Sequence, residues 1–104
     1  MIDKVIRNGK VAVLYSPDFG AGWSTWAHNP ENKEQMIFCP ALVLALEKGE
    51  NLKDVAEQLF PNEYFGGLDD LKICWLDEGD RFWISEYDGS ERVELIDQMF
   101  YHIA

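Results

Sequence analysis

The sequence predicts an α+β fold: a mainly antiparallel sheet with two or three short helices packed on one of its faces. Alternating apolar residues and turn signals indicate strands at both ends of the chain. The middle carries helix-capping residues and an apolar stripe at helical spacing. Strands on both sides of a run of helices are typical of this class. The 104 residues fit a single domain spanning 1–104, and 47% hydrophobic residues suffice for one core.

The first predicted element is an N-terminal β-hairpin. Residues 2–7 and 10–15 flank Asn8-Gly9, the dipeptide preferred in a two-residue turn because both positions adopt positive φ. The second strand is apolar on both faces, from Val11 to Tyr15. This pattern predicts a central position in the sheet.

Two helical segments are predicted after a loop. Asn29-Pro30-Glu31 supplies an N-cap, a proline at the first helical position and an acid in the first turn. The helix it starts contains residues 36–38. Pro40 interrupts that helix and starts a second segment, which ends at Gly49.

A third helix is predicted to begin at Asn51 and to end before Pro61. Its apolar residues recur at helical spacing and form one stripe: Leu52, Val55, Ala56, Leu59 and Phe60. The stripe predicts which side of this helix faces the core.

The C-terminal third is predicted to be a meander of antiparallel strands. Its strands and turns are expected, in order, at 71–76, 77–80 (turn), 81–85, 88–89 (turn) and 92–96. The alternation places Trp83 and Tyr87 on the face opposite Phe82 and Ile84. Residues 97–104 fit either a short helix or a last strand.

The net charge of −10 results from 19 acidic and 9 basic side chains, and it is unevenly distributed. Residues 69–104 hold ten acids and three bases, a net charge of −7 on the predicted meander. Direct binding to nucleic acid or to an anionic membrane is disfavoured, because both need clustered Lys and Arg. The acids are expected either to keep the sheet soluble and its edge protected, or to engage a protein partner with a basic surface.

A cytoplasmic location is the expectation. No signal peptide is visible in the sequence, and the longest apolar stretch, 39–46, is far shorter than a membrane span. Cys39 and Cys74 form no CxxC pair, and with two histidines they give no zinc spacing. Two buried free thiols in a reducing compartment are therefore expected, with a disulfide between them as the alternative.

The loop 15–26 is the first candidate site. Its glycines allow close approach of a ligand to the backbone, and its aromatic and hydroxyl groups could wall a small pocket. The candidate ligand-binding residues are Tyr15, Gly20, Gly22, Trp23, Ser24 and Trp26. The alternative is that the tryptophans belong to the core and the glycines only close the loop.

Catalytic, metal and cofactor sites are not expected. His28 with Cys39, and the carboxylates of Glu86 and Asp88, are the weak candidates for nucleophilic and acid–base chemistry. Neither pair has a wider signature around it. The acids of 77–80 lack the spacing of a calcium loop and are interpreted as a plain turn.

The second candidate site lies on the meander and is aromatic and acidic. Its candidate partner-binding residues are Trp83, Glu86, Tyr87, Asp88 and Glu91. Exposed aromatics often mark an interface, so a homodimer through this face is one alternative.

Two segments resemble parts of small uncharacterised bacteriophage and prophage proteins: Gly20-Ala21-Gly22-Trp23-Ser24-Thr25-Trp26, preceded by Val13-Leu14-Tyr15-Ser16-Pro17, and Arg81-Phe82-Trp83-Ile84-Ser85-Glu86-Tyr87-Asp88-Gly89-Ser90-Glu91. The resemblance implies a phage or prophage setting and brings no activity with it. We therefore expect a small acidic non-enzymatic protein–protein interaction module. The alternative is a small-ligand-binding protein or enzyme that uses the Gly20–Trp26 loop.

Overall fold

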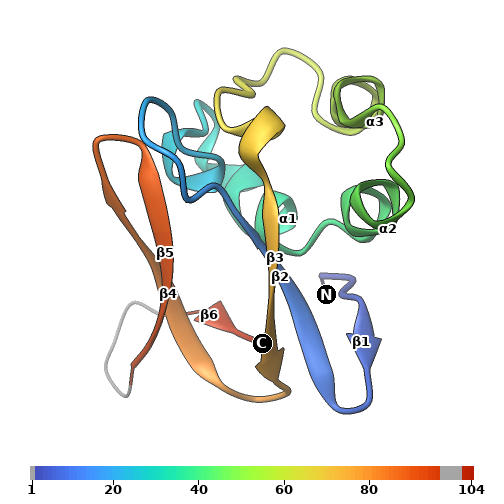
Figure 1. The fold of residues 1–104 in the computed structure, drawn as a ribbon, viewed down its shortest axis with the longest axis vertical. Helices are drawn as coiled ribbons and strands as arrows, with labels where there is room; N and C mark the ends of the chain where they lie inside the picture. The colour runs from blue at the N-terminus through green and yellow to red at the C-terminus, as the bar shows by residue number, and fades with distance from the viewer. Residues whose placement is uncertain (1, 97–101) are drawn as a thin grey trace.

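The computed structural model describes residues 2–96 and 102–104 (Figure 1). Its elements in chain order are β1 (Ile6–Arg7), β2 (Lys10–Tyr15), η1 (Ser24–Trp26), η2 (Pro30–Asn32), α1 (Lys33–Phe38), α2 (Pro40–Lys48), α3 (Leu52–Leu59), η3 (Leu68–Asp70), β3 (Lys72–Asp77), β4 (Arg81–Tyr87), β5 (Ser90–Leu95) and β6 (His102–Ile103), where η marks a 3₁₀ helix. The α+β class is confirmed.

The described strands form two antiparallel sheets. The first has the order β1-β2-β3 and the second the order β5-β4-β6. β2 is therefore central, as its two apolar faces predict. Its pairing with β3 runs from Lys10 opposite Asp77 to Tyr15 opposite Lys72.

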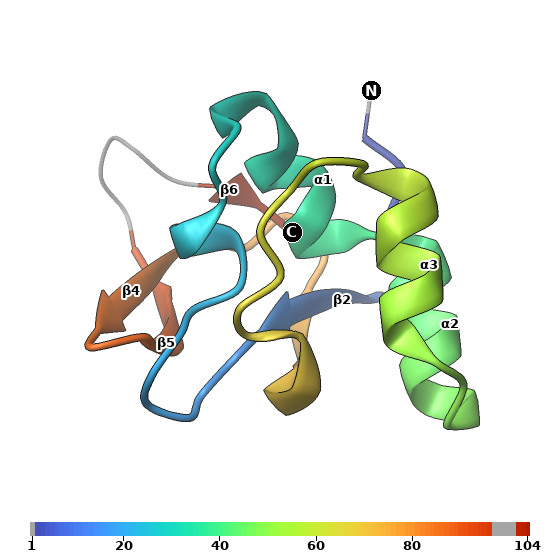
Figure 2. The ribbon, with the colours of Figure 1, turned by 90° about the horizontal axis from the view of Figure 1, so that it is seen from above.

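β2 divides the core into two clusters because its side chains alternate. Ala12 and Leu14 face a cluster that includes residues of α2 and α3. Val11 and Val13 face the second cluster, which includes Phe82 of β4. Figure 1 and Figure 2 show the corresponding layers, with α2 and α3 on one side of β2 and the sheet of β4 and β5 on the other. α2 and α3 thus cover one face of the first sheet and the second sheet covers the other, while α1 contributes Met36 to the first cluster and Ile37 and Phe38 to the second.

Local sequence signals set the element boundaries. Asn8 and Gly9 have φ values of 53° and 77°, which confirms the predicted hairpin turn. Gly49 adopts the left-handed conformation at the end of α2. The side chain of Asn51 accepts a hydrogen bond from the amide of Asp54 and caps α3. Asn29 precedes η2 and makes no side-chain capping bond, so α1 begins later, at Lys33.

The predicted meander is divided between the two sheets. β3 pairs with β2, whereas β4 pairs with β5 and β6. The turn at 77–80 is held by other partners: the amide of Glu78 donates to the carbonyl of Gly9, and the amide of Gly79 donates to the carbonyl of Ala104. β3 and β4 can therefore belong to different sheets, because the backbone groups of each strand form hydrogen bonds with strands other than the one that follows or precedes it at this turn.

Two terminal predictions are resolved only in part. The strand expected over 2–7 is confined to Ile6–Arg7, although the amide of Ala12 still donates to the carbonyl of Val5. Of the segment 97–104, residues 97–101 lie outside the described part of the chain. His102–Ile103 forms a short strand on β4.

Candidate functional site

The outer face of β4 and β5 exposes large aromatic side chains. Trp83 is 41% and Tyr87 78% exposed, whereas Phe82 and Ile84 on the opposite face are buried, as the alternation predicts. In the register of the two strands, Trp83 lies opposite Glu94 and Ser85 lies opposite Arg92. Alternation along β5 therefore places Arg92 on the same outer face, between the two aromatic positions of β4. We call Trp83, Tyr87 and Arg92 the aromatic face.

Phe19 extends the aromatic face beyond the sheet. This residue belongs to the loop after β2 and is 69% exposed. A shallow cavity of about 370 Å³ lies at this end of the hairpin, and Phe19, Tyr87 and Arg92 are among its lining residues. Two aromatic rings and a guanidinium group thus surround one hollow.

Acidic side chains border the aromatic face. Glu86 and Asp88 lie at the β4–β5 turn and are exposed, and Glu94 is partly exposed beside Trp83. One oxygen of Glu86 accepts a hydrogen bond from the amide of Gly89 at 2.7 Å, which closes the turn. This border has the arrangement of a typical interface, in which polar residues surround an aromatic centre.

Glu91 does not belong to this border, which corrects its place among the partner-binding candidates. Its side chain is completely buried and accepts hydrogen bonds from the amide of Ser16 (2.9 Å) and the amide of Trp23 (2.8 Å). The amide and hydroxyl of Thr25 donate to it as well, at 3.0 and 2.5 Å. A buried carboxylate is stable only with such compensation, so its role is internal.

Gly22 is required where the loop closes around Glu91. A Cβ atom at this position would lie 2.5 Å from the Thr25 hydroxyl and 3.0 Å from a carboxylate oxygen of Glu91. The loop is also attached to the β4–β5 turn, because the amide of Gly20 donates to the carbonyl of Asp88. The glycines therefore serve the approach of the loop to β5.

The predicted ligand-binding set is dispersed by the structure. Trp23 has no exposed surface, and its indole N–H donates to the carbonyl of Met36 at 2.9 Å. Ser24 is buried too. Tyr15 packs against the second cluster and lines a different cavity, of about 430 Å³, whereas Trp26 stacks on Tyr64. A pocket walled by both tryptophans is therefore not formed.

A second buried carboxylate, Glu63, was not anticipated from the sequence. It accepts hydrogen bonds from the amides of His28, Asn29 and Tyr64 and from the side chain of Asn32. Burial raises its pKa, but these four bonds outweigh that effect and lower the pKa to about 2. Two of these donors, His28 and Tyr64, also stack their rings on each other, with centroids 5.2 Å apart.

The weak catalytic candidates gain no support. Cys39 and Cys74 are free cysteines, and burial raises the pKa of both thiols. A raised pKa leaves the thiol protonated and unreactive at neutral pH. Within residues 2–96 and 102–104, no group of three or more His, Cys, Asp and Glu side chains is placed to hold a metal ion.

Comparisons of this chain with known protein families, with curated proteins and with solved structures give no match. In the described part of the chain, every helix is too short or too polar to cross a membrane. Function is therefore inferred from the residues of this chain.

Proposed function

We propose that this protein is a non-enzymatic interaction module that binds a partner protein through the aromatic face of β4 and β5. One observation carries the proposal: Trp83, Tyr87 and Arg92 lie together on one exposed sheet face. Trp, Tyr and Arg are the residue types that contribute most of the binding energy in protein interfaces. Their clustering is not needed for the core, which lies on the opposite face.

The acidic border indicates the chemistry of the partner. Glu94 lies opposite Trp83 on this face, Glu86 and Asp88 lie at its turn end, and the whole chain has a net charge of −10. A partner with Lys or Arg around an apolar centre would complement both parts of this surface. The resemblance to phage and prophage proteins favours a bacterial host protein or another phage protein in this role.

The face is held rigid before a partner arrives. Ser90 donates through its hydroxyl to the carbonyl of Pro17, and the amide of Glu91 donates to the carbonyl of Ser16. Together with the buried Glu91 carboxylate, these bonds fix the hairpin to the loop that carries Phe19. Preorganisation of this kind lowers the entropy that binding would otherwise cost.

The cellular setting is part of the same proposal. Both cysteines are free, which suits the reducing cytoplasm. We place the interaction there.

Site-specific photocrosslinking in cells tests the proposal. A photoreactive phenylalanine analogue is introduced at Tyr87 or, as a control, at Leu44, an exposed apolar residue of α2. A discrete crosslinked species is expected from position 87 alone, and mass spectrometry identifies its second component. Equal crosslinking at both positions, or none at position 87, would contradict the proposed face.

Matched substitutions then measure the contribution of the face. Trp83 and Leu44 are each 41% exposed, so Trp83→Ser and Leu44→Ser remove apolar groups of equal relative exposure. Trp83→Ser is expected to weaken binding of the identified partner by about tenfold or more, as hot-spot residues do. Leu44→Ser is expected to leave the Kd unchanged.

A further inference from the structure

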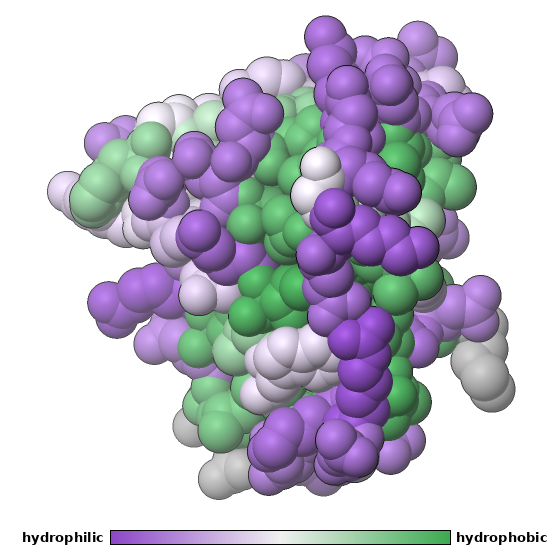
Figure 3. Space-filling view, turned by 45° about the vertical axis from the view of Figure 1, so that its right-hand side comes forward, coloured by the Kyte–Doolittle hydropathy of each residue, from purple (hydrophilic) through white to green (hydrophobic). Residues whose placement is uncertain are grey.

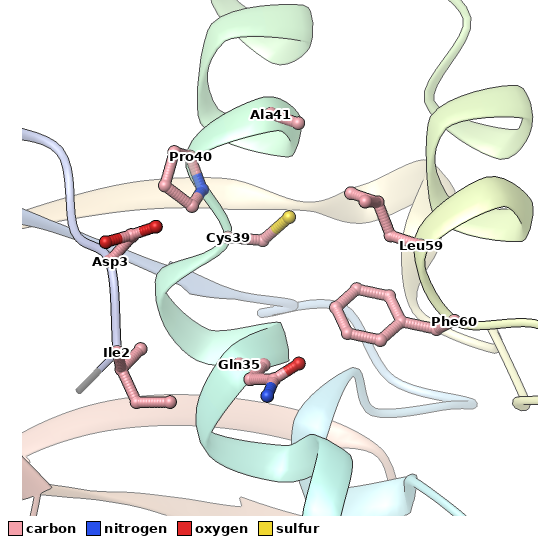
Figure 4. A pocket seen from close by; sticks show the side chains of 8 residues that line it. All are labelled: Ile2, Asp3, Gln35, Cys39, Pro40, Ala41, Leu59 and Phe60. Atoms are coloured by element: carbon pink, nitrogen blue, oxygen red, sulfur yellow. The ribbon is translucent and has the colours of Figure 1, made fainter.

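A second surface, separate from the aromatic face, contains a cavity with several apolar side chains in its wall. It has a volume of about 450 Å³ and lies where α1 ends, α2 begins and α3 ends (Figure 4). Figure 4 shows Leu59 and Phe60 extending from α3 toward Cys39, with the N-terminal segment on the opposite side. The lining residues are Ile2, Asp3, Gln35, Cys39, Pro40, Ala41, Leu59 and Phe60.

The wall of this cavity includes an apolar side chain that the fold leaves uncovered. Leu59 belongs to the apolar stripe of α3, and its neighbours Ala56 and Phe60 are buried in the core. Leu59 itself is 49% exposed and faces the cavity. On the face shown in Figure 3, hydrophobic residues likewise reach the surface between hydrophilic bands. Uncovered apolar area at a hollow is a feature of ligand sites.

Two of the lining residues are polar, and one of these is acidic. Asp3 contributes a carboxylate and Gln35 an amide. The nearest base in sequence, Lys4, is turned away: its ammonium donates to the carbonyl of Ile103 at 2.7 Å and lies over the ring of Phe38. The lining residues include no Lys or Arg, so the cavity has acidic character.

We propose that this cavity binds a small free primary amine in its ammonium form, with an aromatic or branched apolar body. The body would lie against Leu59 and Phe60, and the ammonium group would donate to the carboxylate of Asp3 and the carbonyl oxygen of Gln35. A volume of about 450 Å³ is within the range of small-molecule sites. An anion is disfavoured by Asp3 and by the net charge of the chain.

Four probes separate the contributions of charge and apolar body. They are 2-phenylethylammonium, the neutral 2-phenylethanol, the anion 3-phenylpropionate and methylammonium, which carries charge alone. Each is titrated into the full chain while backbone amide chemical shifts are recorded by NMR. The aromatic ammonium is expected to bind most tightly and to shift residues around the cavity.

Two substitutions are directed at the two ends of the proposed site. Asp3→Asn is expected to weaken 2-phenylethylammonium by about three- to fivefold, the effect of losing one exposed ion pair. The control Asp54→Asn removes an acid of α3 outside the cavity and should leave the affinity for 2-phenylethylammonium unchanged. Ala41→Trp fills the cavity from the exposed first turn of α2 and should weaken binding about tenfold or more, because the ring can no longer be buried.

Leu59→Lys provides a second blocking variant if Ala41→Trp fails to fold, since Leu59 is half exposed. The ammonium group of the introduced lysine should repel 2-phenylethylammonium, so binding should again weaken by about tenfold or more.

Several results would overturn the proposal. If 3-phenylpropionate binds as tightly as 2-phenylethylammonium, the cavity does not select a cation. If methylammonium causes the same chemical-shift changes as 2-phenylethylammonium, or if Asp54→Asn weakens binding as much as Asp3→Asn, the titration measures only general charge attraction. Nα-acetyl-lysine methylamide is expected to bind about tenfold more weakly than the aromatic probe, because its unbranched chain buries less surface. Equal binding would assign the cavity to a lysine of a partner protein instead. None of these outcomes affects the aromatic face.

Discussion

Glu91 and Trp23 are joined by a hydrogen bond of 2.8 Å from the Trp23 amide to the Glu91 carboxylate, across 68 positions of the sequence. The same carboxylate holds Ser16 and Thr25. One side chain of β5 thus fixes the loop that leads from β2 to the helices. The link also stabilises the hairpin on which the aromatic face lies.

Glu91→Gln is expected to destabilise the protein by about 3 kcal/mol, because one acceptor oxygen becomes an NH₂ group that faces donors. Urea denaturation at neutral pH measures the free energy of unfolding. The control Glu94→Gln changes a partly exposed acid of the same strand and should lower the free energy of unfolding by less than about 0.5 kcal/mol. Similar losses for the two variants would argue against the internal role of Glu91.

Glu63 should make stability depend on acid pH. Its pKa is about 2 in the folded protein against an ordinary value of 4.5, so its contribution is complete above pH 4.5 and is lost as the pH falls toward 2. After allowance for solvent screening, this contribution is about 2 kcal/mol. The stability difference between the wild type and Glu63→Gln should therefore shrink over this interval. A difference in unfolding free energy between the wild type and Glu63→Gln that stays constant with pH would refute the assignment.

Trp23 and Trp83 should respond differently to the same substitution. Trp23→Phe leaves the carbonyl of Met36 without its donor in the core and is expected to cost about 2 kcal/mol. Trp83→Phe changes an exposed ring and should cost less than about 0.5 kcal/mol. Thermal unfolding measures both, and acrylamide should quench Trp83 fluorescence more than that of Trp23. An equal loss of unfolding free energy in Trp23→Phe and Trp83→Phe would contradict the burial of Trp23.

The acidic border should influence the rate of association with the partner. Neutralising it in the combined variant Glu86→Gln, Asp88→Asn and Glu94→Gln is expected to slow association by about tenfold at low salt, through loss of electrostatic steering. The difference should nearly vanish at 1 M salt, where screening is almost complete. Surface plasmon resonance with the crosslinked partner measures both rates. Association that is unchanged at low salt would exclude the acidic border from recognition.

Local elements could be predicted from the sequence because their causes are local. Asn8-Gly9 specifies its own turn, Gly49 ends α2, and Asn51 caps α3 with its own side chain. The alternation in β4 likewise gave the exposed and buried sides correctly, since Trp83 and Phe82 are adjacent residues on opposite faces.

The strand pairing could not be predicted in the same way. A turn at 77–80 connects β3 to β4 whether or not the two strands pair. Whether β3 pairs with β4 or with β2 depends on the tertiary structure. β3 pairs with β2 along the whole of that strand, from Lys10 to Tyr15. The resulting second sheet then covers Val11 and Val13, which explains why β2 is apolar on both faces.

The candidate site was predicted only in its exposed part. The exposure of Trp83 and Tyr87 follows from periodicity, but the charge of Glu91 predicts an exposed side chain and the structure buries it. Its position in β5 carried a signal, since residue 91 has the same parity as Val93, which packs against the core. Its partners are mostly backbone amides, which have no signature in the sequence.

The pairing of β2 with β3 has a consequence for how the chain reaches its native state. Lys10 and Asp77 form a salt bridge across 67 positions, so the first sheet cannot be completed until most of the polypeptide has been synthesised. Contacts of such high sequence separation slow folding, because a long segment must be closed before they form. A ribosome-bound chain ending before β3 would therefore expose Val11 to Leu14, and cooperative folding would begin only after the C-terminal third emerges.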